Sequence, residues 1–207
     1  MKMFKDAIVL FLITVVAACA LGAVYEITKG PIEESKAKAK TEAYEKVFGE
    51  IPKMQEVDDC LLEDIAEKIA QEGRLSGSRI NEAYLVLSNE YGGSVDGIIL
   101  SVTNSNGYGG DITIAMGVTC GGTLKGIEFL EISETAGLGM KAKEEKFLGQ
   151  FRDVKTKSFS LPKAKLEGET EMDAVSSATI TSKAVNRAVN AGLYAADVII
   201  NNYLIID

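Results

Sequence analysis

Between Ala7 and Tyr25 the sequence reads AIVLFLITVVAACALGAVY, a stretch of 19 residues without a charged side chain. A helix of this length spans about 28 Å, which is close to the roughly 30 Å hydrocarbon core of a bilayer. Lys2 and Lys5 precede the stretch, and positive charge on that side favours a cytoplasmic N-terminus. We therefore expect one transmembrane helix in the cell (inner) membrane, a single-pass topology, and a C-terminal domain on the extracytoplasmic side.

Two other interpretations of this stretch stay open. A cleaved signal peptide has a polar region after its small-residue site, whereas here apolar residues continue beyond Ala17 and Ala18. The sequence VAAC at Val16–Cys19 also resembles a lipoprotein processing site, in which Cys19 would be the lipidated residue. The uninterrupted apolar run favours a retained anchor.

The composition excludes several classes of function. The chain of 207 residues has a net charge of −8, so it repels phosphate backbones and we expect no nucleic-acid partner. It has no histidine, which removes the commonest general base and most zinc sites, and we expect no metal site. Cys19, Cys60 and Cys120 lie far apart without a CxxC pair. Cys60 and Cys120 could form a disulfide, but we favour two buried free thiols. Any redox chemistry is then expected to come from a bound cofactor.

Beyond the apolar stretch, the hydrophobic pattern predicts helices first and strands later. We expect helices over Pro31–Phe48 and Val57–Gln71, since apolar residues recur there at helical spacing. Four later segments have the apolar or alternating pattern of strands, and short gaps between them favour antiparallel pairing. These segments are 81–89, 97–104, 111–120 and 124–133, the last with a phase slip near Leu130 that indicates a β-bulge.

Two further helical segments complete the predicted fold. One lies near Lys141–Phe151, and a long amphipathic helix ends the chain. The apolar stripe of the long helix comprises Val185, Ala188, Gly192, Ala195, Ile199 and Tyr203, and the opposite polar face comprises Lys183, Arg187, Asn190, Asp197 and Asn201.

The whole pattern predicts an α+β fold, an antiparallel sheet with packed helices preceded by one N-terminal transmembrane helix. We expect a cytoplasmic N-terminus over residues 1–6, the transmembrane helix over 7–25, a helical stalk or linker over 26–78, and the soluble domain over 79–207.

The start of the long helix, SSATITS from Ser176 to Ser182, is unusually rich in hydroxyl groups. One cap needs only one such group, and Asp173 or either serine could provide it. The surplus hydroxyls could simply be solvated polar residues. Alternatively, free backbone N–H groups and small side chains at a helix N-terminus would bind a phosphate. A Gly-Lys pair is missing, so a monophosphate ester fits better than a nucleoside triphosphate.

The stretch DAVSSAT, from Asp173 to Thr179, resembles the flavinylation motif of the FMN-binding domain family. In that family the terminal threonine carries FMN through a phosphoester bond, which implies covalent FMN on Thr179. Ala174 and Ser177 stand where the family often has glycine.

Two other stretches resemble the same family. GYGG at Gly107–Gly110 is similar to a turn before its central strand, and ETAGLG at Glu134–Gly139 is similar to its Glu-Thr-Pro-Gly-Leu-Gly loop, with Ala136 in place of the proline. Besides Thr179, the resemblance implies a set of cofactor-binding residues. This set is Asp173, Ser176, Ser177, Ala178, Thr181, Glu134, Thr135, Gly137, Leu138 and Gly139.

The family occurs in the G subunit of the Rnf electron-transport complex and in the C subunit of the Na+-translocating NADH:quinone reductase. The resemblance therefore implies a membrane-anchored electron carrier that is not catalytic alone. It would belong to an Rnf-type ferredoxin:NAD oxidoreductase coupled to Na+ or H+ translocation, with the other subunits and a flavin transferase as partners. Two alternatives stay open, the FMN-carrying subunit of the quinone reductase and a flavin-free extracytoplasmic scaffold domain.

Overall fold

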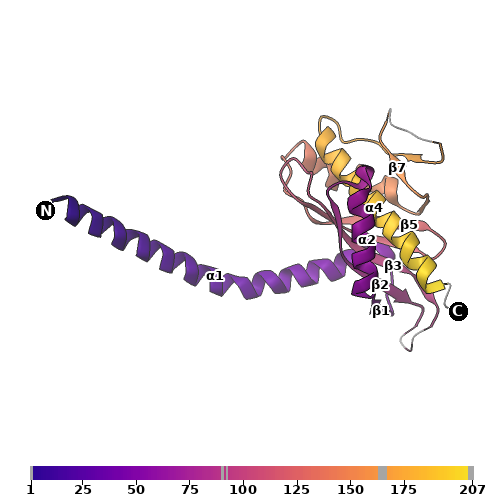
Figure 1. The fold of residues 1–207 in the computed structure, drawn as a ribbon, viewed down its shortest axis with the longest axis horizontal. Helices are drawn as coiled ribbons and strands as arrows, with labels where there is room; N and C mark the ends of the chain where they lie inside the picture. The colour runs from indigo at the N-terminus through magenta and orange to yellow at the C-terminus, as the bar shows by residue number, and fades with distance from the viewer. Residues whose placement is uncertain (1, 90, 92, 163–166, 205–207) are drawn as a thin grey trace. The chain divides into compact units, whose positions relative to one another are not determined.

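The computed structural model describes residues 2–89, 91, 93–162 and 167–204 of the chain (Figure 1). Contacts between residues divide the chain into two units, Met1–Thr41 and Glu42–Asp207. The second unit is an α+β domain built on an antiparallel sheet, so the predicted fold class is confirmed. This unit includes residues 42–78, and the domain limits expected from the sequence stay a prediction.

The first 48 residues contribute one long helix, α1 (Lys2–Phe48). It is long and apolar enough to cross a membrane, and no residue of its most apolar stretch is buried in the protein. The prediction of a new helix at Pro31 is wrong, because the helix continues through this residue. Proline lacks an N–H and so removes one hydrogen bond of the ladder, but the flanking turns continue the helix.

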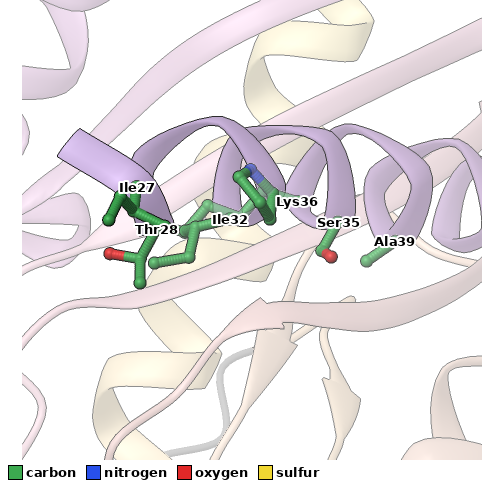
Figure 2. A pocket seen from close by; sticks show the side chains of 7 residues that line it. Ile27, Thr28, Ile32, Ser35, Lys36 and Ala39 are labelled. Atoms are coloured by element: carbon green, nitrogen blue, oxygen red, sulfur yellow. The ribbon is translucent and has the colours of Figure 1, made fainter. Parts of the chain in front are cut away.

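An apolar depression surrounds Pro31 on the surface of α1. Figure 2 shows the side chains that line it, all of which come from this one helix: Ile27, Thr28, Ile32, Ser35, Lys36 and Ala39. The depression is a surface feature of a single helix.

The domain is organised around a six-stranded antiparallel sheet in which neighbouring strands follow one another in the sequence. The strands are β1 (Lys53–Glu56), β2 (Ser78–Leu87), β3 (Val95–Asn104), β4 (Ile112–Thr119), β5 (Thr123–Glu131) and β6 (Val154–Lys155). The bulge predicted near Leu130 is confirmed, because Thr113 pairs with Glu131 whereas Ile114 pairs with Phe129. Strand β1 was not predicted, since its four residues are all exposed and give no alternating apolar pattern.

One face of the sheet is covered by α2 (Asp59–Gln71) and α4 (Thr179–Leu204), which lie side by side in Figure 1 and contact each other. The Asp58 carboxylate caps α2 by accepting a hydrogen bond from Cys60 N. On α4, Gly192 lies so close to the sheet that a Cβ there would be 2.0 Å from Met116 Sδ. A larger residue at this position would have to displace the end of the Met116 side chain.

The opposite face of the sheet carries the last turns of α1. Ala43, Tyr44 and Val47 are buried there, against Val86, Ile99 and Ala115 of the sheet. Glycines make the close approach possible. Gly117 pairs directly with Gly126, and a Cβ on Gly117 would lie 2.9 Å from Val47 O.

Between β5 and α4 the chain forms short elements. They are the 3₁₀ helix η2 (Gly139–Lys143), α3 (Glu145–Leu148), the 3₁₀ helix η3 (Gly149–Phe151), and the strands β7 (Phe159–Ser160) and β8 (Thr170–Glu171), which pair in parallel. The helix predicted over 141–151 is thus a series of short helical turns. Edge-to-face contacts join Phe147, Phe151 and Phe159 at centroid distances of 5.6 and 5.2 Å.

Two side-chain predictions need correction. Asn190 was assigned to the solvent face of the last helix, but it is buried and its amide bonds both the N–H and the carbonyl of Phe159. Cys60 and Cys120 are free thiols, as we favoured, but Cys60 is exposed and Cys120 only half-buried, rather than buried.

Candidate functional site

The loop Gly107–Gly110, which joins β3 to β4, is held by the side chain of Glu134. Glu134 Oε1 accepts hydrogen bonds from Tyr108 N at 2.8 Å and from Gly109 N at 3.3 Å. The carboxylate is buried, with 8% of the residue exposed. Hydrogen bonds from two backbone donors compensate a buried carboxylate for lost hydration. This contact joins two segments that are 25 residues apart in the sequence.

Glycine is required where these segments meet. A Cβ on Gly109 would lie 1.9 Å from Ser133 O, and one on Gly107 would lie 2.9 Å from Glu134 Oε1. Contacts this short are not tolerated, so only a residue without a side chain lets the two backbones approach.

The segment Glu134–Gly139 forms a compact turn. Thr135 O accepts hydrogen bonds from Leu138 N at 3.1 Å and from Met140 N at 3.2 Å. Gly137 has φ +74°, a conformation that side-chain-bearing residues rarely adopt. Ala136 occupies the position of the proline in the family motif without opening the turn. The side chain of Leu138 is exposed.

The hydroxyl-rich segment has two different roles at the start of α4. Ser182 is fully buried, and its Oγ accepts from Val175 N and donates to Ala178 O, both at 2.9 Å. This hydroxyl fastens the incoming loop to the first turn of the helix. Thr179, by contrast, is exposed at the first residue of the helix. Ser177, two residues before Thr179, has φ +61°.

These three segments enclose one pocket of about 470 Å³. Its lining residues are Tyr108, Glu134, Thr135, Leu138, Gly139, Ser177, Ala178, Thr179, Ile180 and Thr181. Three of them, Tyr108, Leu138 and Ile180, are exposed large apolar side chains. The pocket therefore combines a helix N-terminus and hydroxyl groups with apolar surface.

Gly139 lines this pocket at a point where there is no room for a side chain. A Cβ on Gly139 would lie 2.7 Å from Glu134 Cβ, from Glu134 Oε2 and from Thr181 Oγ1. The second carboxylate oxygen of Glu134 and the hydroxyl of Thr181 thus border the same small space. Thr181 is itself buried, with 1% exposed.

Most of the site residues expected from the sequence line this pocket, but three do not. Ser176 and Gly137 lie beside it without lining it. Asp173 is six residues before α4 and does not line the pocket. Its backbone is held by Gln150, whose Oε1 accepts from Asp173 N at 2.7 Å.

Two lining residues were not predicted as site residues. Tyr108 lies inside the GYGG stretch, so the motif indicated this region, and an aromatic residue between glycines was the further signal in the sequence. Ile180 follows Thr179 directly, and an apolar residue on the exposed side of a helix start could have identified it. Both side chains are substantially exposed, at 69% for Tyr108 and 49% for Ile180.

The arrangement suits an anionic ligand with an apolar body. The first N–H groups of an α-helix have no partner within the helix, and with the helix dipole they favour a negative group beside Thr179. Among the residues that the structure describes, no cluster of acidic and cysteine side chains is placed to hold a metal ion.

Comparison with known proteins connects this geometry to a family. The FMN-binding domain family matches residues 107–194, a range that contains all three segments of the pocket. The chain is 34% identical over 194 residues to the G subunit of the Na(+)-translocating ferredoxin:NAD(+) oxidoreductase complex of Acetobacterium woodii, covering 92% of this chain and 89% of that protein. It is 39% identical over 85 residues to the G subunit of the proton-translocating ferredoxin:NAD(+) oxidoreductase complex of Clostridium ljungdahlii, covering 41% of this chain and 45% of that protein.

Among solved structures, the crystal structure of Shewanella oneidensis NqrC matches 60% of this chain and 61% of its own, with 24% identity and a TM-score of 0.46. The resemblance to the FMN-binding domain family is confirmed by the family match and by the identity to the Acetobacterium woodii protein over most of the chain. The chain therefore belongs to the family of G subunits of ion-translocating ferredoxin:NAD(+) oxidoreductase complexes, and it contains an FMN-binding domain over residues 107–194.

Proposed function

We propose that this chain is a membrane-anchored electron-transfer subunit with FMN held in a phosphoester bond to Thr179. It works within an ion-translocating ferredoxin:NAD(+) oxidoreductase complex, as the names of its relatives suggest. The observation that carries the proposal is the convergence of three segments on one pocket. Gly107–Gly110, Glu134–Gly139 and the start of α4 are distant in sequence, yet all contribute to the pocket that Thr179 lines.

The helix start suits the phosphate end of the cofactor. The exposed hydroxyl of Thr179 is accessible to a modifying enzyme, and Ala178 is too small to shield it. The backbone N–H groups of the first turn would bind the remaining phosphate oxygens, helped by the helix dipole. The phosphoester would then be anchored where negative charge is favoured.

The other end of the pocket suits the flavin ring. Tyr108, Leu138 and Ile180 provide apolar surface, and Glu134 and Gly139 shape the wall between them. FMN, when bound, would supply one- and two-electron transfer. The role of the residues is to hold the ring in place and to limit its exposure to water.

Attachment requires a flavin transferase as a partner. The Thr179 hydroxyl would attack the phosphorus of FMN held in a phosphoanhydride with a second nucleotide. The new O–P bond forms, the anhydride bond breaks, and the second nucleotide leaves with the electron pair. The transferase would supply the base that takes the hydroxyl proton.

The rest of the chain agrees with a membrane complex. Helix α1 is long and apolar enough to span a bilayer, and Lys2 and Lys5 favour a cytoplasmic N-terminus. The FMN-binding domain is then extracytoplasmic, where a covalent bond keeps the cofactor from diffusing away. The partners are the other subunits of the complex, and the coupling ion is Na+ or H+.

The test is in-gel flavin fluorescence after denaturing electrophoresis. Wild type, Thr179→Ala and the control Ser176→Ala are each expressed with a flavin transferase, and the site is mapped by peptide mass. We expect fluorescent bands for the wild type and for Ser176→Ala, and a dark band for Thr179→Ala. Fluorescence in Thr179→Ala would refute attachment at this residue, and three dark bands would refute covalent flavin altogether.

A further inference from the structure

Asn104, the last residue of β3, is a fully buried amide with three hydrogen bonds. Its Nδ2 donates to Ser78 Oγ at 2.8 Å and to Ser76 O at 3.2 Å. Its Oδ1 accepts from Asn106 N at 3.0 Å. A buried amide with its hydrogen bonds satisfied fixes both partners, because breaking any bond leaves a polar group without water.

Asn104 thus bonds the turn at residues 76–78, and the two residues after Asn104 bond this turn as well. Asn106 Nδ2 donates to Ser76 O at 2.9 Å, and Ser105 N donates to Gly77 O at 2.9 Å. Gly77 has φ +79°, and a Cβ there would lie 2.1 Å from Asn106 Nδ2. The turn at residues 76–78 and the loop at 104–106 are therefore locked together.

These hydrogen bonds between residues 76–78 and 104–106 lie directly beside a segment of the pocket. The next residues after Asn106 are Gly107–Gly110, whose N–H groups at Tyr108 and Gly109 bond Glu134 Oε1. The turn at 76–78 and Asn104 both lie outside the range 107–194 that matches the FMN-binding domain. Support for the pocket thus extends beyond the matched domain.

We propose that Asn104 is a positioning residue for the pocket at Thr179. It holds the loop of Gly107–Gly110 against the turn at 76–78, and so keeps Tyr108 and Glu134 in their places in the pocket wall. Asn104 itself does not line the pocket. The consequence for a flavin rests on the proposed function, whereas the consequence for the loop does not.

The first arm of the test measures amide hydrogen exchange in the flavin-free, full-length chain. Asn104→Asp removes both amide donor bonds and brings a carboxylate oxygen towards Ser76 O. We expect the N–H groups of Tyr108 and Gly109, which bond Glu134 Oε1, to exchange about tenfold faster, which corresponds to roughly 1.4 kcal/mol of lost protection. If Asn104→Asp fails to fold, Ser78→Ala removes the acceptor of the 2.8 Å bond and gives the same readout.

The matched control is Asn81→Asp. Asn81 Nδ2 also donates to two partners on β3, Ser101 Oγ at 3.1 Å and Thr103 Oγ1 at 2.9 Å, but it does not bond the loop. Faster exchange at 108–109 in Asn104→Asp but not in Asn81→Asp supports the proposal. Unchanged exchange at 108–109, or the same increase in both variants, overturns it.

The second arm uses the flavin-loaded chain and measures the midpoint potential of the bound flavin. We expect a shift in Asn104→Asp and none in Asn81→Asp. Equal potentials in all three proteins would show that the loop does not position the flavin, and would overturn that part of the proposal. A wild-type chain that takes up no flavin would contradict the proposed function, and the exchange arm would still decide the role of Asn104.

Discussion

The carboxylate of Glu134 accepts a hydrogen bond from the backbone N–H of Tyr108 at 2.8 Å, across 26 residues of sequence. We expect Glu134→Ala to lower the free energy of unfolding by about 1–3 kcal/mol, because two backbone donors would lose their acceptor in a buried place. Glu134→Gln keeps an acceptor oxygen and should lose less.

Urea unfolding of the three proteins measures this difference. Glu144→Ala, an exposed carboxylate near the same turn, is the control and should stay close to wild type. Equal losses for the alanine and glutamine variants would show that the charge of Glu134, rather than its acceptor role, stabilises the loop.

Gly139→Ala tests how tightly the pocket wall is packed. The added Cβ would lie 2.7 Å from Glu134 Oε2 and from Thr181 Oγ1, so the wall must move. We expect a loss of about 1–3 kcal/mol in unfolding free energy and reduced flavin attachment. Gly149→Ala is the matched control, because a Cβ there meets nothing within 4 Å and the backbone is helical. If Gly139→Ala keeps the unfolding free energy and the flavin attachment of the wild type, the pocket wall can accommodate the added Cβ.

Removal of the last turns of α1 should destabilise the domain. Tyr44 and Val47 are buried against the sheet, and each buried side chain of this size contributes about 1.5–3 kcal/mol. A chain that begins at Gly49 should therefore unfold or aggregate under conditions in which a chain that begins at Ser35 stays folded. Thermal unfolding followed by circular dichroism compares the two. Equal midpoints would show that residues 42–48 are dispensable.

Ser177 has φ +61°, where a residue with a Cβ is strained. Ser177→Gly removes the strain, and we expect it to raise the unfolding free energy by up to about 1 kcal/mol. Ser176→Gly is the control, since Ser176 does not have a positive φ and should gain nothing. Denaturant unfolding of both variants and the wild type measures the change in unfolding free energy. A loss of stability in Ser177→Gly would mean that the serine side chain makes a stabilising contact.

The sequence predicted those parts of the fold that bury a periodic apolar face. The strands around Ile98 and Ile114 alternate because one face packs against α4, and the slip at Leu130 correctly indicated the bulge. Strand β1 escaped prediction because none of its side chains is buried. Asn190 was misplaced because a polar residue that bonds the backbone of Phe159 looks, in sequence, like a solvated one.

The site was partly predictable for a similar reason. Three short motifs indicated the segments, but their meeting depends on long-range contacts such as Glu134 with Tyr108, which spacing does not contain. The roles of Ser182 and Thr179 could not be separated in sequence either, because both are hydroxyls in one helical turn. Only burial distinguishes them, and burial is a property of the fold.

Alkaline pH should weaken the contact between Tyr44, on the last turns of α1, and Tyr84 of the sheet, whose ring centroids are 6.2 Å apart. Burial raises the pKa of Tyr84 to about 12, and the hydrogen bond from its hydroxyl to Glu82 adds to the effect. The folded state holds this proton more tightly than the unfolded chain, in which the pKa of tyrosine is about 10. The stability that Tyr84 contributes is thus fully present below pH 10 and is lost as the pH rises towards 12.

Tyr84→Phe removes the titrating group, so its unfolding free energy should fall less steeply between pH 10 and 12 than that of the wild type. Urea unfolding at several pH values in this range measures both slopes. Tyr194→Phe, on α4 and outside the cluster on that face of the sheet, is the control and should keep the wild-type slope. Parallel slopes for wild type and Tyr84→Phe would mean that Tyr84 ionises as easily in the folded domain as in the unfolded chain.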